Sequence, residues 1–129
     1  MAIKYLIDTN IFLEILLNQE KKKVCKKCLI DRFGKIAISD FSFHSIGVIL
    51  FRKKKFETFN SFVNDVLPQI EILTTQRKYY TEISNIAIQF NLDFDDAYQV
   101  AVAKSRNITI VTMDKDFEKV KDLYKIEFL

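Results

Sequence analysis

Short apolar segments alternate with longer amphipathic segments along the whole chain, and this order restricts the fold more than any other feature. Short runs rich in β-branched residues predict strands at residues 3–7, 35–38, 70–73, 108–111 and 126–129. The helical spacing of apolar residues predicts helices at 11–17, 21–33, 40–51, 56–66, 76–90, 94–105 and 114–120. Strands that alternate with helices form a parallel sheet covered on both faces. The sequence therefore predicts the α/β class, as a three-layer α/β/α sandwich with a central parallel sheet.

The composition fits one globular domain. A chain of 129 residues with 49% hydrophobic and 29% charged residues can bury a single core and is unlike a disordered chain. Only two glycines and one proline occur, so the loops should be short. We find no repeat and no linker, and we assign residues 1–129 to one domain.

The start of the chain indicates the compartment. Residues 1–8, MAIKYLID, contain no apolar stretch long enough for a secretion signal. No run of 18 apolar residues exists that could cross a membrane. A soluble, cytoplasmic protein is expected. The net charge of +3 is compatible with a polyanionic partner but does not demand one.

Acidic residues follow the predicted strands at the points where ligands bind in α/β folds. Asp8 comes directly after the first strand, and Asp114 follows the strand at 108–111. Asp93, Asp95 and Asp96 open the apolar helix at 94–105. The carboxyl ends of parallel strands share one edge of the sheet, and that edge forms the ligand crevice. We expect Asp8, Asp114 and the acidic helix start to meet there.

Several carboxylates in one crevice repel one another unless a cation lies among them. Carboxylate oxygens are hard ligands that suit Mg²⁺ or Mn²⁺. Such an ion can activate a water molecule and neutralise charge that develops on a phosphoryl oxygen. The pattern therefore favours a phosphodiester as substrate.

Each acid also has an ordinary structural explanation. Asp8 could end a strand and cap the next helix. Asp93 and Asp95 fit the first turn of a helix, where the dipole favours acids, and we prefer that explanation for both. Asp116 is best explained as a turn residue. Asp96 differs, because an idle charge next to Ala97 on a helix that is apolar on most sides would be costly.

Three segments resemble the PIN-domain family of nucleases. Residues 6–14, LIDTNIFLE, are similar to the family's first strand followed by D-T-N. Residues 92–97, LDFDDA, resemble its D-A helix, including the alanine spacing that continues to Ala101 and Ala103. Residues 110–117, IVTMDKDF, resemble its closing strand with T-x-D. Each motif alone is weak, but their order along essentially the whole chain is fairly specific.

The resemblance implies a metal-dependent endoribonuclease. Asp8, Asp96 and Asp114 would be the Mg²⁺ or Mn²⁺ ligands and the catalytic residues. Thr112 would support the site through its hydroxyl group, and Asn10 would hold the first loop. Asp93 and Asp116 would be further supporting residues. Many relatives are toxins of type II toxin–antitoxin pairs, so the resemblance also implies an RNA substrate, a small antitoxin partner and a homodimer.

The chain departs from the family pattern after the second strand. The family carries a glutamate on the following helix, where this sequence has Ser45 beside His44, its only histidine. Loss of that carboxylate favours one metal ion over two. His44 could act as a ligand, base or phosphate contact oriented by Asp40, or could be a partly buried, hydrogen-bonded histidine.

The same departure leaves another function open. A degenerate PIN-like module could bind RNA or a protein without cleaving. A phosphate-accepting signalling domain, with Asp8 as a ligand, fits the motif order poorly. Two basic clusters, at residues 21–27 and 52–55, could contact phosphates or be solvated helix faces. The apolar stripe at 56–66 could be core or could bind a second copy or an inhibitor helix.

Overall fold

Five parallel strands form the centre of the molecule. The computed structural model describes residues 2–129. Its strands are β1 (Tyr5–Ile7), β2 (Ile36–Ser39), β3 (Glu71–Leu73), β4 (Thr109–Thr112) and β5 (Ile126–Phe128). They lie in the order β3-β2-β1-β4-β5, and every neighbouring pair is parallel. The parallel sheet expected from the sequence is therefore confirmed.

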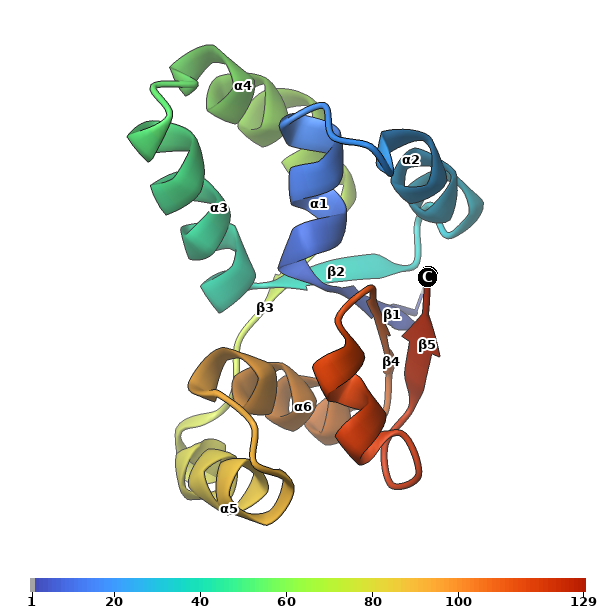
Figure 1. Ribbon diagram of the computed structural model, residues 1–129, viewed down its shortest axis with the longest axis vertical. Helices are drawn as coiled ribbons and strands as arrows, with labels where there is room; N and C mark the ends of the chain where they lie inside the picture. Colours follow the sequence, from blue (N-terminus) through green and yellow to red (C-terminus); the bar gives the residue numbers. More distant parts are fainter. Residues whose placement is uncertain (1) are drawn as a thin grey trace.

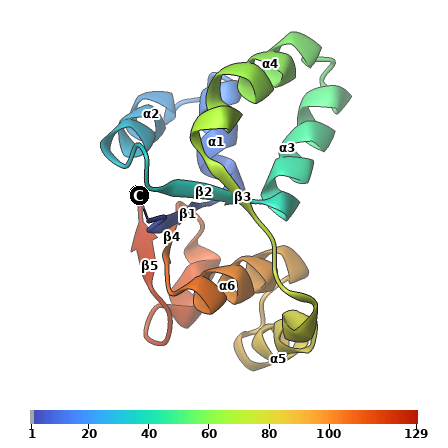
Figure 2. The same ribbon diagram turned by 180° about the vertical axis from the view of Figure 1, so that it is seen from behind.

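Helices cover both faces of this sheet (Figures 1 and 2). One layer holds α1 (Thr9–Leu16), α2 (Lys22–Asp31), α3 (Asp40–Arg52) and α4 (Phe56–Ser61). The other layer holds α5 (Tyr80–Phe90), α6 (Phe94–Arg106) and the 3₁₀ helix η4 (Lys115–Val120). The predicted three-layer α/β/α sandwich is confirmed. Between residues 2 and 129, no helix is both long and apolar enough to span a bilayer.

Successive side chains of each strand enter opposite cores. Leu6 and Ile110 pack with α5 and α6, whereas their neighbours Ile7 and Val111 pack with α1 and α3. All four side chains are fully buried. Because side chains alternate across a strand, a sheet with helices on both faces needs apolar residues at consecutive positions. This explains why the strand segments are apolar runs rather than alternating patterns.

Helix α6 is buried along most of its length, as its composition predicts. Every residue from Asp96 to Ala103 is buried, because the helix packs between the sheet and α5. Ala97, Ala101 and Ala103 lie in this stretch and keep its packing surface small. The backbone of α6 can therefore approach the sheet closely, and this brings its acidic first turn to the strand ends.

Several helix ends differ from the prediction. Asp8 is the N-cap of α1, and its carboxylate accepts the backbone N–H of Thr9. Ser39 is the N-cap of α3, and its hydroxyl accepts the backbone N–H of Ser42. The helix predicted at 56–66 is α-helical only to Ser61 and continues as a π-helical turn, η1 (Phe62–Val66), and a 3₁₀ turn, η2 (Leu67–Gln69). The predicted helix at 76–90 begins as a 3₁₀ turn, η3 (Arg77–Tyr79).

The order of the strands places a crevice between β1 and β4. From β1 the chain moves to β2 and β3 through α1–α4, then returns to β4 and β5 on the other side of β1 through α5 and α6. The connections therefore leave β1 and β4 toward opposite faces. In open parallel sheets, ligands bind at the carboxyl ends of the strands at such a switch point. Asp8 and Asp114 follow these two strands.

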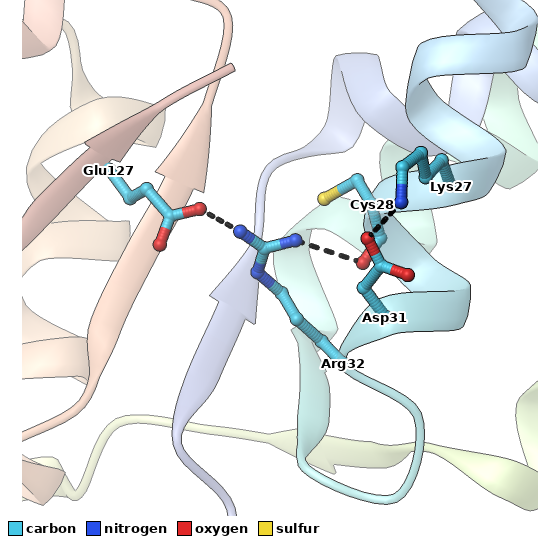
Figure 3. Close-up of polar contacts among 5 residues, drawn as sticks. All are labelled: Lys27, Cys28, Asp31, Arg32 and Glu127. Carbon is cyan, nitrogen blue, oxygen red and sulfur yellow. Dashed lines mark hydrogen bonds and ion pairs between the residues drawn. The ribbon is translucent and has the colours of Figure 1, made fainter.

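Arg32 joins the end of α2 to the edge strand β5 (Figure 3). Its guanidinium group pairs with the Glu127 carboxylate and donates to the backbone carbonyl of Cys28 at 3.1 Å. It also lies 5.2 Å from the ring centre of Tyr5. By contrast, the nearby pair between Lys27 and Asp31 is exposed on the surface of α2.

This difference predicts unequal effects on stability. Arg32→Ala should lower the free energy of unfolding by about 1–2 kcal/mol, because it removes a partly buried ion pair, a carbonyl contact and a cation–π contact. Lys27→Ala removes a comparable cation from α2 and should change the free energy of unfolding by less than about 0.5 kcal/mol. Urea denaturation of both variants measures the difference. Equal losses would show that the Arg32 contacts contribute no more than a surface pair.

Candidate metal centre

A cavity of about 200 Å³ opens at the carboxyl ends of β1 and β4. Residues from α1, α3, α6 and the β4–η4 turn line it. They are Asp8, Thr9, Asn10, Leu13, Phe41, Ser45, Ile49, Asp95, Asp96, Gln99 and Asp114. Three larger cavities lie elsewhere, two of them mainly apolar, and none of the three has more than two carboxylates in its lining, whereas four aspartates line this one. We name it the acidic cavity.

Asp8 is the most firmly held acid of the acidic cavity. It is 6% exposed, and its carboxylate accepts hydrogen bonds from Thr9 N and Gln99 Nε2, both at 2.8 Å, and from Thr112 Oγ1 at 2.7 Å. Burial raises the pKa of Asp8, and the bonds from Thr112 and Thr9 oppose that rise. These donors fix the orientation of the carboxylate and favour its charged form.

Thr112 connects Asp8 to Asp114. Its buried hydroxyl donates to Asp8 and accepts the backbone N–H of Asp114 at 2.9 Å. The Asp114 carboxylate in turn accepts the N–H of Asp116 at 2.9 Å and caps η4. One side chain at the end of β4 therefore sets the relative position of two acids from opposite ends of the chain.

Three carboxylates gather beside Asp8. One oxygen each from Asp96, Asp114 and Asp116 lies within 4.8 Å of the others. Asp96 is 7% exposed, and burial followed by the negative charge of Asp95 and Asp114 raises its pKa to about 7. Burial and the neighbouring charges together therefore disfavour the ionised form of Asp96.

The donor set fits a divalent cation. All of these groups are carboxylates, which are hard oxygen ligands of the type that Mg²⁺ and Mn²⁺ prefer. Within residues 2–129, none of the ion pairs involves an acid of the acidic cavity. Repulsion between the acids, which adds to burial in raising the pKa of Asp96, is therefore not relieved by a lysine or an arginine, and a bound cation would relieve it.

Hydroxyl groups hold the opposite wall of the acidic cavity. Thr9 Oγ1 donates to Ser42 Oγ at 2.7 Å, and Ser39 Oγ lies 3.1 Å from the same oxygen. Ser39 and Ser42 are fully buried. These bonds tie the first turn of α1 to the first turn of α3. They keep the turn that carries Asp8 beside Ser45 on α3.

The structure separates two neighbours on α3. Ser45 lines the acidic cavity, so the position that resembles the family's glutamate faces the acids without a carboxylate. His44 is exposed and lines an apolar groove between α3 and α4 instead. His44 therefore lies outside the acidic cavity, and the alternative of a partly buried, hydrogen-bonded histidine is wrong. Adjacent residues on a helix point about 100° apart, so only one of them can face the cavity.

Asp40 and Asp93 also lie outside the acidic cavity. Asp40 accepts a hydrogen bond from the Tyr98 hydroxyl at 2.6 Å and does not orient His44, which corrects that expectation. Asp93 is the N-cap residue of α6, is exposed, and makes no capping bond through its side chain. Asn10 does line the cavity, in the first turn of α1, but is exposed and makes no hydrogen bond there with residues 2–129.

Sequence reasoning missed two residues of the cavity. Asp95, interpreted as a first-turn acid only, lines the acidic cavity with Asp96. Gln99 is 3% exposed and donates to Asp8, while its Oε1 atom has no partner within residues 2–129. The signal for Gln99 was present, since it is a polar residue three positions after Asp96 on an otherwise apolar helix.

Comparison with known proteins identifies the family. The PIN domain model matches residues 5–123. The chain belongs to the PIN domain family. Among curated proteins, no sequence match was found.

Solved structures of PIN-like proteins share this fold at low sequence identity. The structure of DNA-bound VapBC from Salmonella typhimurium aligns with a TM-score of 0.80 and 17% identity, and covers 98% of each chain. A toxin–antitoxin complex from Klebsiella pneumoniae aligns with a TM-score of 0.77 and 18% identity, covering 96% of each chain. VapBC2 from Rickettsia felis, bound to a promoter DNA fragment, has a TM-score of 0.73 and 22% identity, covering 100% of this chain and 99% of that one.

The raised pKa of Asp96 predicts a pH-dependent effect on stability. In the unfolded chain Asp96 ionises near pH 3.8, and in the folded protein near pH 7. Between these values only the unfolded state has lost the proton, so the stability of the metal-free protein falls as pH rises. Asp96→Asn removes this loss. The full difference between the two pKa values of Asp96 corresponds to about 4 kcal/mol of unfolding free energy. Local relaxation of the folded protein around the charged side chain reduces this amount, so we expect the variant to be about 2 kcal/mol more stable at pH 8.

Urea denaturation at pH 4 and pH 8, without divalent cations, measures this effect. The gain should nearly vanish at pH 4, where Asp96 is protonated in the folded protein. The same gain at both pH values would show that the asparagine acts through packing and not through charge.

Proposed function

We propose that this protein is a Mg²⁺- or Mn²⁺-dependent endoribonuclease that hydrolyses RNA phosphodiester bonds. The observation that supports this most directly is the convergence of Asp8, Asp96 and Asp114 in one cavity of a PIN domain. These three residues are the proposed metal ligands and catalytic residues. A bound divalent cation would supply a polarised water molecule and neutralise charge on the phosphoryl oxygen.

Some residues of the acidic cavity would bind the cation, and others orient the side chains that bind it. Asp8 is oriented by Gln99 and Thr112, so its carboxylate keeps one position. Asp96 and Asp114 present oxygens that are close together and carry no cationic partner within residues 2–129. Asp116 adds a third oxygen at the exposed rim. Deprotonation of Asp96, with its pKa of about 7, is required before all of these groups can hold a cation.

Removal of one ligand provides the test of the reaction. Asp8→Asn should lower Mg²⁺-dependent cleavage of single-stranded RNA by at least about 100-fold, because a neutral amide binds the cation weakly. The matched control is Asp122→Asn, at an exposed aspartate outside the acidic cavity. Gel analysis of labelled RNA measures both. Equal cleavage by wild type and Asp8→Asn would refute the nuclease assignment.

The alternative is a catalytically degenerate PIN-like module that binds RNA or a protein partner. Ser45 supports it, because this side chain brings no carboxylate to the acidic cavity. The remaining acids favour a single cation over two.

Calorimetry with Mn²⁺ separates the two functions. We expect one binding event whose affinity increases between pH 6 and pH 8, as Asp96 loses its proton, and which Asp96→Asn weakens at least about tenfold. Asp122→Asn should bind as the wild type does. No heat of binding at either pH would favour the degenerate module.

We further propose that the protein is the cytoplasmic toxin of a type II toxin–antitoxin pair, with a small antitoxin and a homodimeric state. Support comes from its structural similarity to VapBC proteins and to a toxin–antitoxin complex. Both partners need apolar surface, and two grooves offer it. One lies between α3 and α4, with about 610 Å³, and the other between α2 and η1, with about 310 Å³. Co-purification with the product of an adjacent gene would test the pairing.

A further inference from the structure

Aromatic side chains form a continuous surface beside the acidic cavity. Phe41 lies in the first turn of α3 and Phe94 is the first residue of α6, and their ring centres are 5.9 Å apart. Both rings contact Tyr98 at centre distances of 6.0 Å, and Tyr80 lies 6.4 Å beyond it. We call Phe41 and Phe94 the aromatic pair.

The aromatic pair packs on a buried residue, and both of its rings are partly exposed to solvent. Phe94 stacks on Tyr98 at an interplanar angle of 27°. Tyr98 is only 3% exposed, and its hydroxyl donates to Asp40 and accepts the backbone N–H of Thr75. Phe94 is nevertheless 54% exposed, and Phe41 36%. The Phe94 ring is thus packed against a buried tyrosine and is still more than half exposed.

The position of the pair connects it to the acids. Phe41 lines the acidic cavity itself, and Phe94 directly precedes Asp95, which lines it too. Arg77 and Lys78, in the turn η3 that directly precedes Tyr80, are exposed. Exposed aromatic rings therefore lie directly beside the carboxylates of the acidic cavity.

This combination of carboxylates and exposed aromatic rings matches one class of ligand. Unpaired nucleobases stack on aromatic rings, and cations contact the phosphates that join them. In a duplex the base faces are already stacked and cannot reach such a ring. A purely apolar protein segment would explain the rings, but not their position beside the carboxylates of the acidic cavity.

We propose that Phe41 and Phe94 form a stacking platform that binds the base of a nucleotide next to the cleaved phosphate. This proposal rests on the proposed function and adds a determinant of substrate choice to it. The platform would hold one base by its ring face and leave the adjacent phosphate at the acidic cavity. Recognition by stacking tolerates different bases, because every base offers a π-face.

Paired changes in protein and RNA test the platform. The probe is a fluorescein-labelled ten-nucleotide RNA that the wild type cleaves with Mg²⁺, and a series in which each nucleotide in turn lacks its base. Binding is measured by anisotropy with Ca²⁺ in place of Mg²⁺, and gels verify that the RNA stays intact. For the wild type, loss of one particular base should weaken binding about tenfold.

The same base should no longer matter once the ring is absent. Phe94→Leu should weaken binding of the complete RNA about tenfold and show almost no further loss with the abasic RNA. Phe41→Leu should act in the same direction, and Phe94→Trp should retain affinity because it keeps a stacking face. Phe33→Leu is the matched control, since Phe33 is 60% exposed, follows the end of α2 and does not line the acidic cavity.

The outcomes separate this proposal from the nuclease assignment. The platform proposal is overturned if removal of a base weakens binding equally in wild type and in Phe94→Leu at every position of the RNA. It is also overturned if Phe33→Leu loses as much affinity for the complete RNA as Phe94→Leu does. If the wild type still cleaves with Mg²⁺, the proposed function survives that result. Absence of any RNA binding by the wild type overturns the platform as well. Urea midpoints close to the wild-type value verify that the variants are folded.

Discussion

The parallel pairing of β1 with β4 is the interaction on which the rest of the structure depends. It joins Leu6 to Ile110 and Ile7 to Val111, four fully buried residues at the centre of the sheet. Because the chain leaves these two strands toward opposite faces, helices must cover both sides, and the strands must be apolar throughout. The same pairing sets Asp8 and Asp114 side by side just beyond the strand ends. Fold and candidate site are thus consequences of one register.

The acids of the cavity are held in different ways. Asp8 accepts three hydrogen bonds, and those from Thr112 and Thr9 oppose the rise in its pKa that burial causes. Asp96 receives no such bond within residues 2–129, and burial, followed by the negative charge of Asp95 and Asp114, raises its pKa to about 7. A set that combines one oriented carboxylate with one that is easily protonated is stable without metal at low pH and receptive to metal at higher pH. The grooves on the helical layers are, in contrast, mainly apolar and suit protein partners.

The sequence predicted what depends on local pattern and chain order. β-branched runs located the strands, and their alternation with helices predicted the parallel sheet and its acidic edge. Side-chain direction was harder to predict. His44 and Ser45 are adjacent, yet the helix rotation that decides which one faces the acids is set by packing of α3 against α1 and the sheet. The role of Gln99 was not predicted because its hydrogen-bond partner, Asp8, lies 91 positions away in the sequence. Whether Asp8, Asp96 and Asp114 act as ligands remains a prediction for the experiments above.

The separation of these acids along the chain has a consequence for synthesis on the ribosome. Asp8 emerges early, but the hydroxyl group that orients it belongs to Thr112, 104 positions later. Until β4 has been made, β1 lacks one of its two neighbours, and the turn that carries Asp114 does not exist. A nascent chain therefore cannot assemble the cavity. Whatever chemistry the folded chain performs cannot begin before β4 and the turn that carries Asp114 have been translated.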